Sequence, residues 1–108
     1  MAQFDVYLNS GKGAKAAPFL VDVQHNLFTT CNTIVVVPLL SAKIARERDM
    51  DFIENANPVF MFGDTEVVLA SHLMTAIRAK ELSGKVVGSI ASMRSDILAA
   101  MDVIFSGV

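Results

Sequence analysis

The stretch Thr33-Ile34-Val35-Val36-Val37-Pro38-Leu39 decides how this chain folds. Its first five residues are all β-branched, and such residues favour strands over helices. An apolar run without alternation is typical of a strand that is buried on both faces. We therefore predict the central strand of a sheet over Thr33–Leu39. Pro38 has no backbone N–H to donate to a neighbouring strand, so we expect the strand to end there.

Two further strands are predicted on the N-terminal side of this stretch. Over Gln3–Leu8 every second residue is apolar, which places Leu8 on the buried face and Tyr7 on the opposite one. Pro18–Gln24 alternates in the same way, and we expect it to pair with the first strand in antiparallel orientation. Residues 9–17 are rich in glycine, lysine and small side chains, which predicts an exposed, mobile loop.

A short helix and a β-hairpin are predicted after the central strand. Ser41 is suited to cap a helical turn over Ser41–Arg48, because its hydroxyl oxygen can accept a backbone N–H. Val59–Phe62 and Thr65–Ala70 flank Gly63-Asp64, an order of residues that suits a type II′ or related turn. The region 71–88 fits either a helix or an extended chain, and its pattern leaves both alternatives open.

The C-terminal segment is the clearest predicted helix. Its apolar residues recur at spacings of three and four, namely Ile90, Met93, Ile97, Met101 and Ile104. We expect Ser89 or Ser92 to cap the start and Gly107 to mark the end. Asp96 lies close to the positive end of the helix dipole. The last residues, Val103–Val108, remain apolar, so this end is expected to be buried or to form an interaction surface.

Composition indicates one domain over residues 1–108 that binds further copies of itself. The chain has 108 residues, of which 53% are hydrophobic, and its mean hydropathy is +0.48. Such an apolar excess favours an oligomer. No apolar run is long enough for a membrane span, and no secretory signal is expected at the start, so we predict a cytoplasmic protein. The net charge is −2 with scattered basic residues, which disfavours direct binding to nucleic acid.

The residues that could serve in catalysis or ligand binding show no pattern typical of an active site or a metal site. Cys31 is the single cysteine, and with only His25 and His72 beside it in the composition no metal-ligand spacing is recognisable. None of the three has a neighbour in sequence that would make it a nucleophile or a general base. The Gly11-Lys12-Gly13 stretch lacks the pattern of a phosphate-binding loop. We therefore expect no enzymatic activity, no cofactor and no metal.

The chain resembles the CcdB family, the toxins of a plasmid-type toxin–antitoxin pair. The similarity begins with Gln3-Phe4 and Val6-Tyr7 and is strongest over Phe19–Gln24, where an aromatic residue precedes Val-Asp-Val-Gln. It continues through further short motifs, namely Val37-Pro38-Leu39, Ser41-Ala42, Gly63-Asp64, Arg94, Asp96-Ile97, Ala100, Phe105 and Gly107. The resemblance implies a mainly β protein, a twisted antiparallel sheet of SH3-like barrel type with a C-terminal α-helix.

The resemblance also implies a function that makes or breaks no bond. Proteins of this family form homodimers in which the two helix ends lie side by side. The dimer binds the A subunit of DNA gyrase and traps the cleaved gyrase–DNA complex, while a disordered tail of the cognate CcdA-like antitoxin neutralises it. These properties predict a topoisomerase inhibitor that serves plasmid maintenance, with no membrane partner.

The gyrase-binding residues implied by the family fall at the C-terminus and in one loop. The family motif Trp-Gly-Ile lands on Ser106, Gly107 and Val108. Serine in place of tryptophan removes the large aromatic contact, including its cation–π energy of about 1 to 2 kcal/mol. The remaining positions of this surface correspond to His25, Leu27, Phe28 and Asp102, and Asp102 replaces an amide by a carboxylate.

Two other hypotheses remain open. The first is a binding module of the same fold that keeps the antitoxin as its partner and has lost or changed its gyrase target. The second is an RNase, because toxins of similar architecture can cleave RNA. The acidic composition and the lack of clustered histidine, arginine and glutamate residues disfavour the RNase hypothesis.

Overall fold

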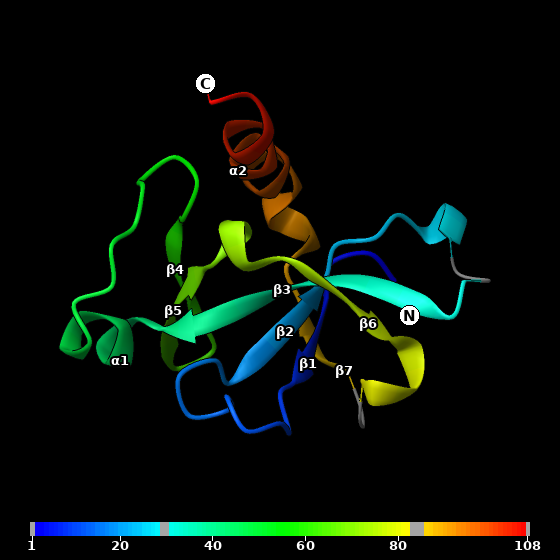
Figure 1. Cartoon of the computed structure of the whole chain (residues 1–108), viewed down its shortest axis with the longest axis horizontal. Helices are drawn as coiled ribbons and strands as arrows, with labels where there is room; N and C mark the ends of the chain where they lie inside the picture. The colour runs from blue at the N-terminus through cyan, green and yellow to red at the C-terminus, as the bar shows by residue number, and fades with distance from the viewer. Residues whose placement is uncertain (1, 29–30, 83–85, 108) are drawn as a thin grey trace.

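A computed structural model describes residues 2–28, 31–82 and 86–107. Seven strands lead to a helix near the C-terminus, with short helical turns between them (Figure 1). The strands are β1 (Asp5–Leu8), β2 (Phe19–Asp22), β3 (Thr33–Ser41), β4 (Val59–Phe62), β5 (Thr65–Leu69), β6 (Thr75–Arg78) and β7 (Val86–Ser89). The helices are α1 (Ala42–Glu47) and α2 (Arg94–Ser106), and the 3₁₀ turns are η1 (Asn26–Phe28), η2 (Ser71–Leu73), η3 (Ala79–Glu81) and η4 (Ala91–Met93).

The strand β3 is the centre of the sheet, as predicted. The hydrogen-bonded order is β4-β5-β3-β2-β1-β7, and β6 also pairs with β3. The first half of β3 is bonded to β6 and its second half to β5, and every pairing in the sheet is antiparallel. The prediction that β3 ends at Pro38 is wrong. The strand continues to Ser41, and the Pro38 carbonyl accepts the Ala70 N–H at 3.0 Å, so only the donor side of this residue is lost.

The first strand confirms the antiparallel pairing and corrects the predicted alternation. β1 pairs with β2 in the register Val6 to Val21. The register against β7 shifts between Val6 and Tyr7, which marks a β-bulge. Both residues at the shift are buried, whereas Leu8 is 54% exposed. The extra residue of the shift lies on β7, between Val86 and Gly88, and the pairing of β1 with β2 stays regular. The predicted one-sided burial is wrong, because Val6 and Tyr7 are buried on opposite faces of β1 and Leu8 at its end is exposed.

The predicted helical turn and hairpin are confirmed. The Ser41 hydroxyl accepts the Ile44 N–H at 3.4 Å and caps α1. β4 and β5 pair across Gly63-Asp64, and Gly63 has a φ of +59°, as the first central residue of a type II′ turn requires. The region 71–88 follows the extended alternative. It contains the strands β6 and β7 with the 3₁₀ turns η2 and η3, and residues 83–85 lie outside the described residues.

The helix α2 places one narrow face in the core. Ile97 and Ala100 are completely buried and pack with residues of β1, β2, β3 and β5. Neither Ser89 nor Ser92 caps α2 itself, because the 3₁₀ turn η4 leads directly into the helix and Met93 occupies the cap position. The Ser89 hydroxyl instead accepts the Ala91 N–H at 3.1 Å, where η4 begins. Gly107 ends the helix in a left-handed conformation, as predicted.

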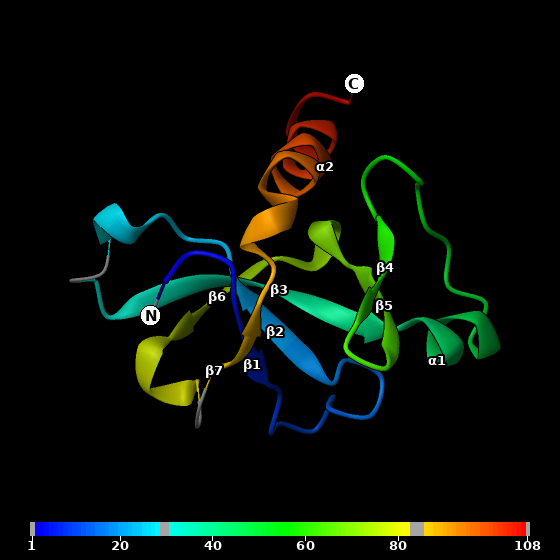
Figure 2. The same cartoon turned by 180° about the vertical axis from the view of Figure 1, so that it is seen from behind.

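The overall architecture is a curled antiparallel sheet with a C-terminal helix, which confirms the predicted fold class. The opposite views in Figures 1 and 2 show α2 standing away from the sheet, so that its end projects clear of the strands. A smaller apolar cluster around Leu40 and Val68 lies beside α1 and receives Met50 and Phe52. The main core thus holds the root of α2 and leaves its tip accessible.

Candidate functional site

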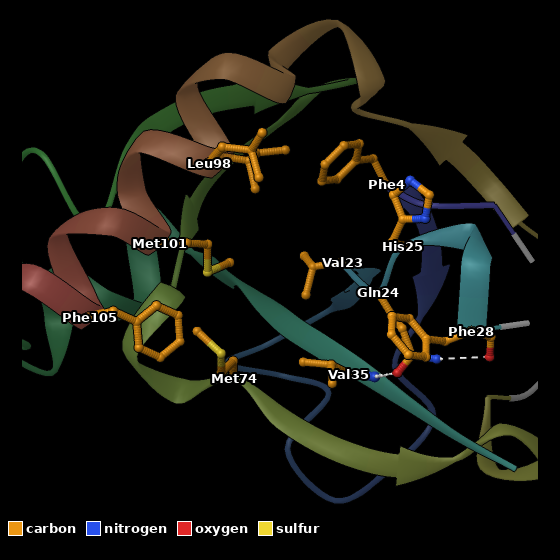
Figure 3. Close-up of a pocket in the computed structure, with 11 residues that line it drawn as sticks. Phe4, Val23, Gln24, His25, Phe28, Val35, Met74, Leu98, Met101 and Phe105 are labelled. Carbon is orange, nitrogen blue, oxygen red and sulfur yellow. Dashed lines mark hydrogen bonds between the residues drawn. The ribbon is translucent and has the colours of Figure 1, made fainter. Parts of the chain in front are cut away.

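An apolar groove of about 420 Å³ lies between α2 and the segment around η1. Leu98, Met101 and Phe105 face it from α2, as Figure 3 shows. The opposite wall and the floor come from the sheet and the η1 segment, through Phe4, Val23, Gln24, His25, Phe28, Val35 and Met74. Only Gln24 and His25 bring polar groups to this lining. The groove therefore suits an apolar partner surface better than a small polar substrate.

The η1 wall is held by hydrogen bonds from one glutamine. Gln24 donates to the carbonyls of Phe28 at 3.3 Å and Thr33 at 3.1 Å. Its side-chain oxygen accepts the Val35 N–H at 3.2 Å, and Figure 3 draws this bond beside the one to Phe28. Within the turn, Leu27 N–H donates to His25 Nδ1 at 3.0 Å. The wall is therefore fixed to β3 although most of its side chains are exposed.

The tip of α2 carries the apolar end predicted from sequence. Phe105 is 76% exposed, and its ring forms one end of the groove. The Ser106 hydroxyl donates to the Asp102 carbonyl at 2.6 Å, and the Gly107 N–H donates to the Val103 carbonyl at 2.9 Å. The hydroxyl is thus bound to its own helix rather than directed outward.

The sequence-predicted site residues come together only in part. His25 and Phe28 line the groove with Phe105, although more than seventy residues separate them from it in the chain. Leu27 is 77% exposed but lines no part of the groove. Asp102, Ser106 and Gly107 are exposed near the tip of α2, and Val108 lies outside the described residues. The sequence pattern did not indicate that Leu98, Met74 and Gln24 line this groove. Their positions there depend on contacts between segments that are distant in the chain.

The three candidate catalytic side chains occupy separate places. His25 borders the groove, whereas Cys31 lies in a hollow of about 550 Å³ beside Arg78 and Lys80. His72 Nδ1 lies 3.1 Å from the side-chain nitrogen of Asn57. Over residues 2–28, 31–82 and 86–107, no group of three or more His, Cys, Asp or Glu side chains could hold a metal ion.

A buried carboxylate that the sequence pattern did not predict lies at the end of β2. Asp22 is 3% exposed, and its Oδ1 accepts the Gln24 N–H at 2.9 Å. Burial raises the pKa of Asp22 above its ordinary value of 3.8, although the bond from Gln24 opposes the shift. Burial also raises the pKa of Tyr7, and the charges of Asp5 and Asp22 add to the effect.

A surface ion pair joins α1 to the hairpin. The Arg46 guanidinium donates to Glu66 Oε1 at 2.7 Å, and this hydrogen bond lowers the pKa of Glu66. Both side chains are largely exposed, so the pair contributes little to stability.

The curled sheet, the projecting helix and the apolar groove define a protein of the CcdB fold. A family model described as CcdB protein matches residues 3–107 of the chain. The chain therefore belongs to the CcdB family, which consists of toxins of toxin–antitoxin systems rather than of catalytic enzymes. No curated protein matches the chain. In the described part of the chain, each helix is too short or too polar to pass through a bilayer.

Proposed function

We propose that this toxin binds the A subunit of DNA gyrase and traps the cleaved gyrase–DNA complex, and that a cognate CcdA-like antitoxin neutralises it. The observation that carries the proposal is the family match over nearly the whole chain, residues 3–107. The toxin acts by contact alone, so its effect depends on surface complementarity rather than on a catalytic group.

The gyrase-binding surface we propose comprises Ser106 and Gly107 at the α2 tip, together with His25, Leu27, Phe28 and Asp102. Val108, which lies outside the described residues, is included in the proposal from the family motif alone. Support comes from the position of η1 across the groove from the tip. Phe28 is 49% exposed and Leu27 77% exposed, so both offer apolar area without rearrangement of the sheet. Apolar and aromatic side chains of this kind supply most of the binding energy in protein interfaces.

Phe105 supplies the aromatic surface that Ser106 lacks. Serine at 106 binds its own helix through the Asp102 carbonyl, which leaves little for a partner. Phe105 is the adjacent residue and is 76% exposed. An aromatic ring at this place offers stacking area, although it is smaller than an indole. The proposal therefore includes a weaker gyrase contact than one with a tryptophan at position 106.

The toxin acts as a homodimer in this proposal. Exposed apolar side chains gather along one flank of α2, where Leu98 is 41% exposed and Phe105 lies beyond it. A second copy packed against Leu98, at the α2 side of the groove, would bring the two helix ends together, as the family resemblance implies, and leave His25 and Phe28 on the opposite wall for gyrase. Gyrase and the antitoxin would be met in the cytoplasm, which is the compartment that we propose for the toxin.

A second candidate function is a binding module that retains the antitoxin and has lost or changed its gyrase target. Ser106 favours it, because the residue lacks the aromatic anchor and its hydroxyl is already bonded. An adjacent reading frame encoding a DNA-binding N-terminus and an acidic tail would support an antitoxin partner under either function.

The deciding experiment measures the affinity of the purified protein for a gyrase A fragment, with gyrase-mediated DNA cleavage assayed in parallel. Binding together with accumulation of cleaved DNA supports the gyrase proposal. Antitoxin binding without gyrase binding supports the second candidate. Dimerisation is tested by sedimentation, where Leu98→Lys is expected to favour the monomer and Ala91→Lys, an exposed position of η4 that does not line the groove, is not.

A further inference from the structure

A second groove lies on another flank of α2. Two adjoining hollows of about 340 and 660 Å³ separate the helix from the loop before β4. Glu54, Asn55, Pro58 and Asp96 line both of them. Figures 1 and 2 show this loop rising beside α2. The two hollows, named here the acidic groove, share no lining residue with the groove that contains Phe105.

One stripe of α2 forms the helix wall of the acidic groove. Asp96, Ala99 and Val103 follow one another at spacings of three and four, which places them on the same side of the helix. Ala99 has the smallest side chain of the three and leaves room for an incoming group. Leu98 and Phe105 point instead into the first groove. The helix therefore offers two independent flanks.

The loop wall is held in place by a buried amide. Asn57 is 4% exposed, and its Oδ1 accepts the Ile53 N–H at 3.0 Å. Its nitrogen donates to the Leu69 carbonyl at 3.1 Å, which ties the loop to β5. Because one bond requires the amide oxygen and the other the nitrogen, the orientation of Asn57 is fixed. A groove with such a wall is formed before any partner arrives, which lowers the entropic cost of binding.

The chemistry of the acidic groove selects a cationic partner. Two carboxylates, Glu54 and Asp96, border it, and none of the residues lining either hollow is basic. Phe52, Met93 and Val59 add apolar area to the lining. We propose that the acidic groove docks a segment of a partner protein that carries arginine or lysine beside apolar residues. Such a segment places its cations on the carboxylates and its apolar side chains on the helix.

This site is distinct from the surface proposed for gyrase. A partner in the acidic groove would leave Phe105, Phe28 and His25 uncovered, because these residues line the other groove. The toxin could therefore hold two partners at once. The proposal stands on the geometry of this flank alone, and a negative result with gyrase would leave it unchanged.

The test uses a labelled short peptide of alternating leucine and arginine, with a peptide of alternating leucine and glutamate as its counterpart. Binding to the full-length protein is followed by fluorescence polarisation. We expect the arginine peptide to bind, and the Glu54→Gln/Asp96→Asn variant to weaken it about tenfold, the loss that two partly exposed ion pairs can account for. Ala99→Phe should have a similar effect by filling the groove. Circular dichroism confirms that each variant is folded.

The matched control is Glu47→Gln/Asp64→Asn, which removes the same charge from residues that line neither hollow. If the control weakens binding of the arginine peptide equally, the effect of the groove variant is explained by net charge alone and the proposal is overturned. Equal binding of both peptides, or no binding of the arginine peptide, would overturn it too. If the groove variants convert a dimer into a monomer, the acidic groove is an interface between copies of the toxin, and the proposal of a separate partner fails.

Discussion

The ring of Phe62 on β4 lies directly over Gly88 on β7. A Cβ atom at position 88 would lie 2.6 Å from Phe62 Cζ, far inside van der Waals contact. β4 and β7 stand at opposite ends of the hydrogen-bonded strand order, so this contact joins the two edges of the curled sheet. Phe62 also packs edge-to-face on Phe19, with ring centroids 5.0 Å apart. The curl therefore depends on a missing side chain at one position.

Gly88→Ala should destabilise the fold by about 1 to 3 kcal/mol, the usual cost of overpacking, because the Phe62 ring must move away. Chemical denaturation measures the loss. In a Phe62→Ala background the same change should become neutral or stabilising, since alanine is otherwise preferred to glycine in a strand. A double-mutant cycle without coupling between the two positions would contradict this account of the curl.

Ile97→Asp should unfold the domain. Ile97 is 0% exposed, and an unpaired charge there costs about 4 kcal/mol or more against a total stability of about 5 to 15 kcal/mol. Met101→Asp should cost less, because Met101 is only half-buried at the edge of the groove. Ser95→Asp on the exposed side is the control. Similar melting temperatures for the Ile97 and Ser95 variants would mean that the helix does not pack as described.

Asp22→Asn should change how stability depends on pH. Because burial raises the pKa of Asp22, the folded state holds this proton more tightly than the unfolded chain does. The contribution of Asp22 to the free energy of unfolding is therefore largest below pH 3.8 and falls as pH rises through the raised pKa. The asparagine at position 22 can still accept the Gln24 N–H but does not ionise. The variant should therefore gain stability relative to the wild type as pH rises through the raised pKa of Asp22. A difference in urea midpoints that is constant with pH would refute the prediction.

Deleting Ser106–Val108 should abolish killing through gyrase and leave the fold and antitoxin binding intact. Within the described chain these residues form only the last bonds of α2, to Asp102 and Val103. Ser106→Trp should strengthen binding to the gyrase A fragment by about 2 kcal/mol, a typical hot-spot energy. If neither wild type nor Ser106→Trp binds, while the protein still arrests growth, its target is not this gyrase surface.

Replacing His72 by alanine and Cys31 by serine should leave toxicity largely intact, and His25 is kept because it belongs to the proposed gyrase surface. The three side chains lie in different parts of the structure, so they form no shared catalytic centre. His72 is bonded to Asn57, so some loss of stability is expected, and circular dichroism must first confirm folding. Loss of toxicity in a well-folded double variant would revive the hypothesis of an enzyme.

Much of the fold could be predicted because local rules govern it. The β-branched run around Val36 marks the central strand, Gly63-Asp64 marks a hairpin, and the spacing around Ile97 marks the C-terminal helix. Local rules failed where a neighbouring strand intervened. β3 continues past Pro38 because the Pro38 carbonyl still accepts the Ala70 N–H, and both Val6 and Tyr7 are buried in β1, which pairs with β2 on one side and β7 on the other. Both outcomes depend on partners distant in sequence.

The sequence alone determined the order of strand and helix segments along most of the chain, its family and the apolar character of its end, because composition, periodicity and short motifs are properties of neighbouring residues. Only the tertiary structure decided which flank of α2 faces which wall. His25 and Phe105 share a groove, and Glu54 and Asp96 share another, because the curl of the sheet sets two loops against one helix. Such pairings arise from packing between distant segments, which no local pattern encodes.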